Sequence, residues 1–68
     1  MELVKQLSEE LRKRGNKTIK MVFWNDAQGN LSVVYRGGKS INFPSQGVLD
    51  PDLTVEQICD IIENYERV

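Results

Sequence analysis

Apolar residues recur at helical spacing near the start of the chain. Leu3, Leu7 and Leu11 are four residues apart, which places them on one face of a helix. Charged residues fill the remaining faces, and Gly15 follows as a residue that can end a helix in a left-handed conformation. The pattern predicts an amphipathic helix over residues 2–14.

Three short segments that follow are rich in β-branched and aromatic residues, which favour strands. We expect strands at Thr18–Trp24, Leu31–Arg36 and Lys39–Phe43. The loop at residues 25–30 contains Asn, Asp and Gly, which tolerate positive φ, and the glycine pair 37–38 predicts a tight hairpin turn.

A second helix has the clearest start signal in the chain. Thr54 is a favourable N-cap, and Gln57 three residues later completes a capping box. Leu53 and Ile58 have the spacing of a hydrophobic staple around this cap. We expect the helix to run over about Val55–Glu66.

The order of elements is therefore α-β-β-β-α, and residues 1–68 are expected to form a single small α+β domain. The strands should form a three-stranded antiparallel meander with two helices packed on one face. Strict alternation predicts that the covered face carries Ile19, Met21, Phe23, Leu31, Val33, Tyr35, Ile41 and Phe43.

The same alternation places Val22, Trp24 and Val34 on the open face, beside Lys20 and Arg36. An open sheet face is normally polar, so this apolar group is a candidate protein-binding surface. Trp and Arg often anchor protein interfaces. The alternative is that Trp24 only packs across neighbouring strands to stiffen the sheet.

Charge is unevenly distributed along the chain. Residues 1–40 carry a net charge of +4 and residues 41–68 a net charge of −5, which gives −1 overall. The basic residues Arg12, Lys13, Arg14 and Lys17 form an alternative candidate site, which would bind nucleic acid through phosphates. The competing explanation is that these cations stabilise the negative end of the first helix.

Residues with catalytic potential are scarce. The chain has no histidine and a single cysteine, Cys59, which lies among apolar residues of the second helix. Neither carboxylate pair, Asp50 with Asp52 or Glu56 with Asp60, is expected to sit in a desolvated cleft. We expect no enzyme activity, no metal site and no cofactor.

Composition also suggests where the protein works. One cysteine cannot form an internal disulfide, no apolar stretch is long enough to span a membrane, and the charged N-terminus does not resemble a signal peptide. We expect a cytoplasmic protein whose partner is another protein or a second copy of itself, with nucleic acid as the alternative partner.

The α-β-β-β-α order is similar to that of double-stranded-RNA-binding domains and of HicA-type toxins. The RNA-binding domains place lysines at the start of the second helix, whereas here Asp50, Asp52 and Glu56 occupy that region and would repel phosphate. The HicA-type ribonucleases depend on a histidine, which this chain lacks. The resemblance implies a shared arrangement of elements without the residues of either activity.

Overall fold

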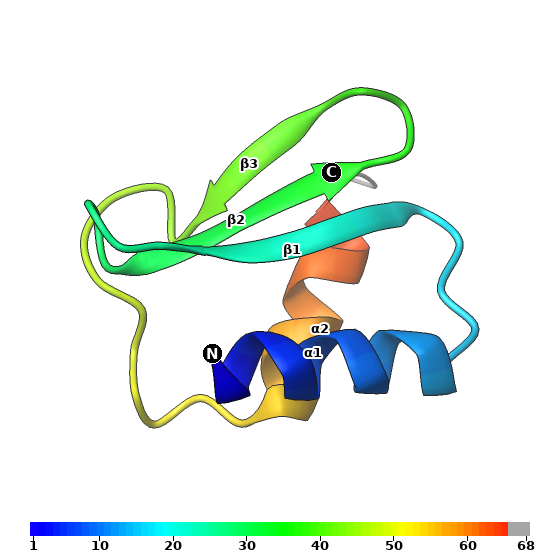
Figure 1. The fold of residues 1–68 in the computed structure, drawn as a ribbon, viewed down its shortest axis with the longest axis horizontal. Helices are drawn as coiled ribbons and strands as arrows, with labels where there is room; N and C mark the ends of the chain where they lie inside the picture. The colour runs from blue at the N-terminus through cyan, green and yellow to red at the C-terminus, as the bar shows by residue number, and fades with distance from the viewer. Residues whose placement is uncertain (66–68) are drawn as a thin grey trace.

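The chain folds in the predicted order, a helix, three strands and a second helix (Figure 1). The computed structural model describes residues 1–65. The elements are α1 Glu2–Lys13, β1 Ile19–Asn25, β2 Asn30–Tyr35, β3 Ser40–Phe43 and α2 Val55–Asn64. The predicted end of the second helix, at Glu66, lies outside the described residues.

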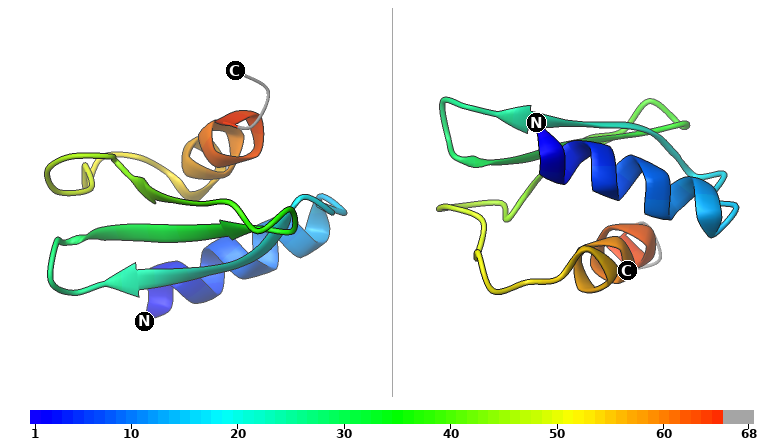
Figure 2. Two further views of the ribbon diagram at one scale, coloured as in Figure 1. Left: turned by 90° about the horizontal axis from the view of Figure 1, so that it is seen from above. Right: turned by 60° about the horizontal axis from the view of Figure 1, so that its bottom comes forward.

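The three strands form one antiparallel sheet in the order β1-β2-β3. Both helices cover the same face, so the molecule has two layers and the other face of the sheet is open (Figures 1 and 2). We call this open side the outer face. The predicted fold class is confirmed.

The end of α1 is a hydrogen-bonded glycine cap. Gly15 has a φ of +69°, and its N–H donates to the carbonyl of Arg12 at 3.0 Å. The N–H of Asn16 donates to the carbonyl of Leu11, also at 3.0 Å. These two bonds form a Schellman motif, which turns the chain toward β1.

The start of α2 has the predicted capping box. The hydroxyl of Thr54 accepts from the Gln57 N–H at 3.1 Å, and the Gln57 side chain accepts from the Thr54 N–H at 2.9 Å. Both bonds satisfy donors that the first turn leaves unpaired.

The core lies between the sheet and the two helices. Its fully buried side chains come from α1, β2 and α2, and they are Leu7, Leu31, Val33, Tyr35, Ile58, Cys59 and Ile62. The hydroxyl of Tyr35 donates to the carbonyl of Ile62 at 2.7 Å, which satisfies a polar group at the end of α2 inside the core.

A β-bulge at Lys20 changes the faces of β1. Ile19 lies opposite Tyr35, but Met21 lies opposite Val34, so Lys20 has no counterpart on β2. A bulge adds one residue to a strand, and every side chain beyond it then points to the face opposite that expected from unbroken alternation.

The predicted placement of Val22 and Trp24 on the open face is therefore wrong. Val22 is 6% exposed in the core, and Trp24 is partly buried against it on the helix side of the sheet. Met21 and Phe23, which were expected in the core, are 50% and 45% exposed. All four residues are apolar, so alternation could not select a face, whereas the bulge lets Ile19, Val22 and Trp24 all face the helices.

The segment after β3 is tied to the β1–β2 loop. The N–H of Leu49 donates to the carbonyl of Gly29 at 3.0 Å. The amide nitrogen of the buried Asn30 side chain donates to the carbonyls of Pro44 and Gly47 at 3.2 and 3.4 Å. The segment therefore follows this end of the sheet before it enters α2.

The bulge can be tested by comparing two neighbouring truncations. Val22→Ala should lower the free energy of unfolding by about 2 kcal/mol because it removes methyl groups from the core. Phe23→Ala, although it removes more atoms, should cost less than about 1 kcal/mol because the ring is half exposed. Urea unfolding of both variants measures the difference. The reverse order of costs would show that β1 keeps unbroken alternation.

Candidate functional site

A groove of about 440 Å³ lies between α1 and the first half of β1. Leu11, Ile19 and Val22 provide its apolar lining. Three basic side chains also line it: Arg12 from the last turn of α1, Lys20 from the bulge and Arg36 from the end of β2. We call this the basic groove.

The charged side chains that line the basic groove are all positive. No carboxylate is among its lining residues. Arg12, Lys20 and Arg36 are exposed, and the ion pairs between side chains in residues 1–65 do not include them. The groove therefore offers three cations to an anionic ligand.

Arg14, the fourth cation expected in the basic run, is engaged elsewhere. Its Nε donates to Glu10 at 2.8 Å, and its Nη1 donates to Asp60 and to Glu63 at 2.7 Å each. We call these four residues the Arg14 cluster. The carboxylates raise the pKa of Arg14, so the side chain stays charged and joins the end of α1 to α2. Arg14 does not present a free cation to nucleic acid.

Asn16 extends the Arg14 cluster into the link between α1 and β1. Its side-chain nitrogen donates to Glu63 at 2.9 Å, while its oxygen accepts from the N–H groups of Thr18 and Ile19 at 3.1 and 2.9 Å. Burial alone would raise the pKa of Glu63, but the hydrogen bonds from Asn16 and Arg14 outweigh it and lower this pKa below 4.5.

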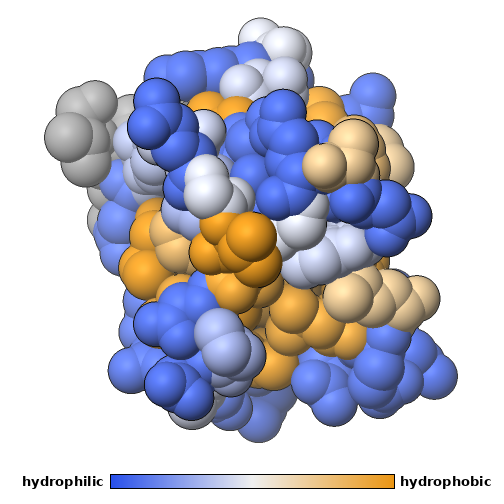
Figure 3. All heavy atoms as spheres, turned by 90° about the vertical axis from the view of Figure 1, so that its left-hand side faces the viewer, coloured by the Kyte–Doolittle hydropathy of each residue, from blue (hydrophilic) through white to orange (hydrophobic). Residues whose placement is uncertain are grey.

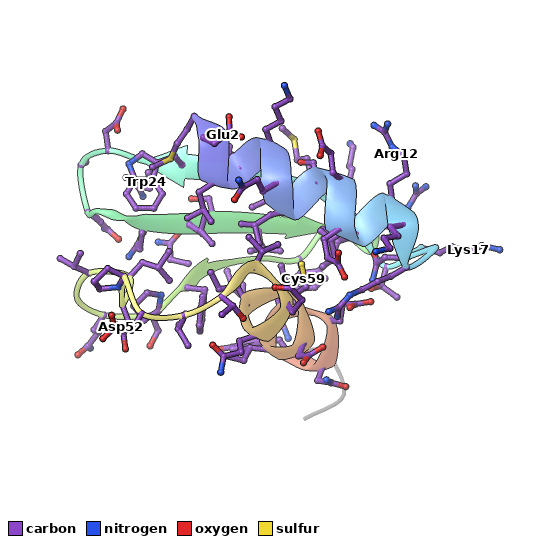
Figure 4. All side chains as sticks on the ribbon, turned by 90° about the horizontal axis from the view of Figure 1, so that it is seen from below. Glu2, Arg12, Lys17, Trp24, Asp52 and Cys59 are labelled. Atoms are coloured by element: carbon purple, nitrogen blue, oxygen red, sulfur yellow. The ribbon has the colours of Figure 1, made fainter. Side chains whose placement is uncertain are left out.

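The predicted basic run is therefore divided among different surroundings. Arg12 lines the basic groove, and Arg14 bridges the helices. Lys13 and Lys17 are exposed and do not line the groove. Figure 4 shows Arg12 and Lys17 pointing away from the body of the protein.

The outer face carries an apolar group different from the predicted one. Met21 lies opposite Val34, and Phe23 lies two residues along β1 on the same face, opposite Ser32. We call Met21, Phe23 and Val34 the outer apolar patch. Met21 also lines the basic groove, so the two surfaces are continuous. Sequence reasoning missed Met21 and Phe23, although four consecutive apolar residues in β1 meant that one pair had to be exposed.

The β2–β3 side of the outer face is polar. The hydroxyl of Ser32 donates to the side chain of Asn42 at 3.0 Å, and Asn42 donates to Gln28 at 3.3 Å.

Apolar side chains also reach the surface at the end of the molecule that carries the β1–β2 loop (Figure 3). Val48, which is 73% exposed, follows the strands in a loop and lies over Gly29. The outer apolar patch instead lies on the paired strands β1 and β2.

Cys59 is fully buried on α2 where this helix faces α1 (Figure 4), and burial raises the pKa of its thiol to about 11. Residues 1–65 contain no group of three or more Cys, Asp or Glu side chains arranged to hold a metal ion. In the same part of the chain, neither helix has the length and apolar character needed to cross a membrane.

Comparison with known proteins does not assign the chain to a family. No family model, curated protein or solved structure matches it. The basic groove and the outer apolar patch are the surface features of the described residues that bear on function.

The role of Arg14 can be separated from that of a neighbouring arginine. Arg14→Gln should lower the thermal unfolding midpoint by several degrees, because it leaves Glu10, Asp60 and Glu63 close together without a cation. Arg12→Gln removes the same charge from an exposed site and should leave the midpoint nearly unchanged. Equal midpoints for the two variants, measured by circular dichroism, would contradict a linking role for Arg14.

The stability of the fold should also depend on pH through the ionisation of Glu63. Because its pKa is lowered in the folded state, its contribution is present above pH 4.5 and is lost as the pH falls through the folded value. The wild type should therefore exceed Glu63→Gln in unfolding midpoint near neutral pH, and the difference should shrink on acidification below about pH 4.5. Glu9→Gln, on an exposed side chain outside the Arg14 cluster, is the control. A difference that is independent of pH would be inconsistent with the lowered pKa.

Proposed function

We propose that this domain is a non-enzymatic protein-binding module that contacts a partner protein through the outer face. The observation that carries the proposal is the outer apolar patch, in which Met21 and Phe23 are each about half exposed on one strand. The patch continues across the sheet to Val34. An open antiparallel face is ordinarily polar, and a cluster of large apolar side chains there favours an interface.

The basic residues at the margin support the same proposal. Lys20 and Arg36 are exposed and lie at the end of the sheet where Met21 joins the basic groove. Charged residues at the rim of an interface guide orientation and association more than they add affinity. In this proposal Lys20, Arg36 and Val34 keep the binding roles expected from the sequence. Val22 and Trp24 do not take part, because they pack against the core on the helix side of the sheet.

Nucleic-acid binding is the alternative proposal, supported by the convergence of Arg12, Lys20 and Arg36 on the basic groove. Lys13 and Lys17 are exposed nearby and could add phosphate contacts, but Arg14 is occupied by carboxylates. Affinity for a duplex would then fall steeply with salt. The outer apolar patch has no role in this alternative, so protein binding accounts for more of the surface.

A photo-crosslinking amino acid at position 23 tests the protein-binding proposal in cells that naturally carry the protein. Irradiation should give a discrete adduct, because the side chain at this position lies in the interface. The mass of the adduct distinguishes a partner protein from a second copy of the chain. The matched control places the same amino acid at Ile61, which is 39% exposed on α2 in the other layer. No adduct at position 23, or the same products from both positions, would contradict the proposal.

A further inference from the structure

We propose that the basic groove binds an extended acidic segment of the partner, which adds to the free edge of β1 as a fourth strand. This inference rests on the proposed function and specifies how the partner is recognised. It follows from three properties of one site: the direction of the β1 backbone, the shape of the groove below it and the charge around it.

The outer edge of β1 faces no other strand of the described sheet. β1 is the first strand of the sheet and pairs only with β2 among the described strands. The N–H of Tyr35 donates to Lys39 on the β3 side, so Val33, two residues earlier, also directs its backbone toward β3. Val22 and Trp24 lie opposite Val33 and Leu31 and therefore direct their N–H and C=O groups away from β2. These are the groups that an added strand would bond.

The groove gives the side chains of an added strand a place to pack. Its lining includes Leu11 on α1 and Ile19 and Val22 on β1. Alternate side chains of the segment would point toward this apolar lining, and the others would extend the outer face beside Met21. Strand addition of this kind takes affinity from backbone bonds and specificity from pockets for alternate side chains.

The charge of the site selects an acidic segment. Arg12 approaches from the helix layer, while Lys20 and Arg36 approach from the sheet. A lysine at a bulged edge discourages indiscriminate strand pairing. The same cations attract an acidic segment. One set of side chains therefore disfavours segments without carboxylates and favours segments that carry them.

A second copy of the chain fits this site poorly. Its two edge strands are Ile19–Asn25 and Ser40–Phe43, and neither contains a carboxylate. Pairing through β1 would instead bring a second Lys20 to the site. The occupant is therefore a segment of a different protein.

The phosphate backbone of a nucleic acid would also contact fewer features of the site than an acidic peptide segment. Arg12, Lys20 and Arg36 could contact phosphates, and the N–H of Val22 could donate to one, but the carbonyl of Val22 and the apolar lining would gain nothing from them. The acidic segment would contact the backbone groups of β1, the apolar lining and the three cations.

The probe is a short fluorescent peptide of alternating glutamate and valine, with a peptide of alternating lysine and valine as its control. The acidic peptide should bind the wild-type chain in fluorescence anisotropy, and the lysine peptide should not. In amide NMR spectra, the acidic peptide should shift the N–H signals of Val22 and Trp24 and slow their exchange with solvent, because these groups become hydrogen-bonded.

Two variants of equal charge provide the decisive comparison. Lys20→Glu with Arg36→Glu should weaken binding of the acidic peptide by about tenfold or more. Lys5→Glu with Lys39→Glu changes the same charge on exposed residues outside the groove and should stay within about twofold of the wild type. Thermal unfolding of both variants verifies that they remain folded.

Three results would overturn the inference. The first is that the acidic peptide does not bind. The second is that it binds without affecting the Val22 and Trp24 amides. The third is that duplex RNA or DNA displaces it with a steep dependence on salt, which would assign the groove to nucleic acid. Crosslinking at position 23 stays informative in each case. A partner captured there without peptide binding in the groove would leave the proposed function intact and remove only the fourth-strand inference.

Discussion

The bulge at Lys20 is the constraint on which the functional surface depends. It lets Ile19, before the bulge, and Val22, after it, both face the helices. The consequence is that Met21 and Phe23 must face solvent. The bulge also places Lys20 at the margin of the groove. One additional residue in β1 therefore determines the core, the outer apolar patch and part of the basic groove, which is consistent with the use of bulges to re-aim side chains.

Polar side chains join the two helices at one end. A domain of this size has a small core, and its single cysteine provides no disulfide. Arg14 and Asn16, at the end of α1, instead reach carboxylates on α2. Asn16 also bonds the backbone that leads into β1, so the same contacts that join the helices fix where the first strand begins. The position of the basic groove beside this strand follows from them.

Local signals in the sequence were sufficient for the elements and their order. The glycine cap after α1 and the capping box at Thr54 act over a few residues, so they could be recognised without knowing the fold. The faces of β1 could not be predicted in this way. Met21 and Phe23 are as apolar as Val22 and Trp24, and only the pairing with β2 decides which pair is buried.

The candidate site was predictable only in part, because contacts between residues far apart in the sequence decide which side chains are free. Val34 lies opposite Met21 on the outer face because the bulge changes β1 and not β2, and Lys20 and Arg36 are exposed. Arg14 was grouped with its basic neighbours because sequence distance hides Asp60 and Glu63, which α2 brings to it. Long-range pairing, rather than composition, separates a structural arginine from a surface one.

Exposed positive and negative side chains lie in different parts of the surface. The exposed cations Arg12, Lys20 and Arg36 line the groove beside the end of α1 and the start of β1, whereas the exposed carboxylates Asp52 and Glu56 lie just before α2 and in its first turn. A negatively charged molecule that approaches by diffusion is drawn to one side and turned away from the other before any contact forms. The domain can therefore orient such a molecule during encounter although its net charge is only −1.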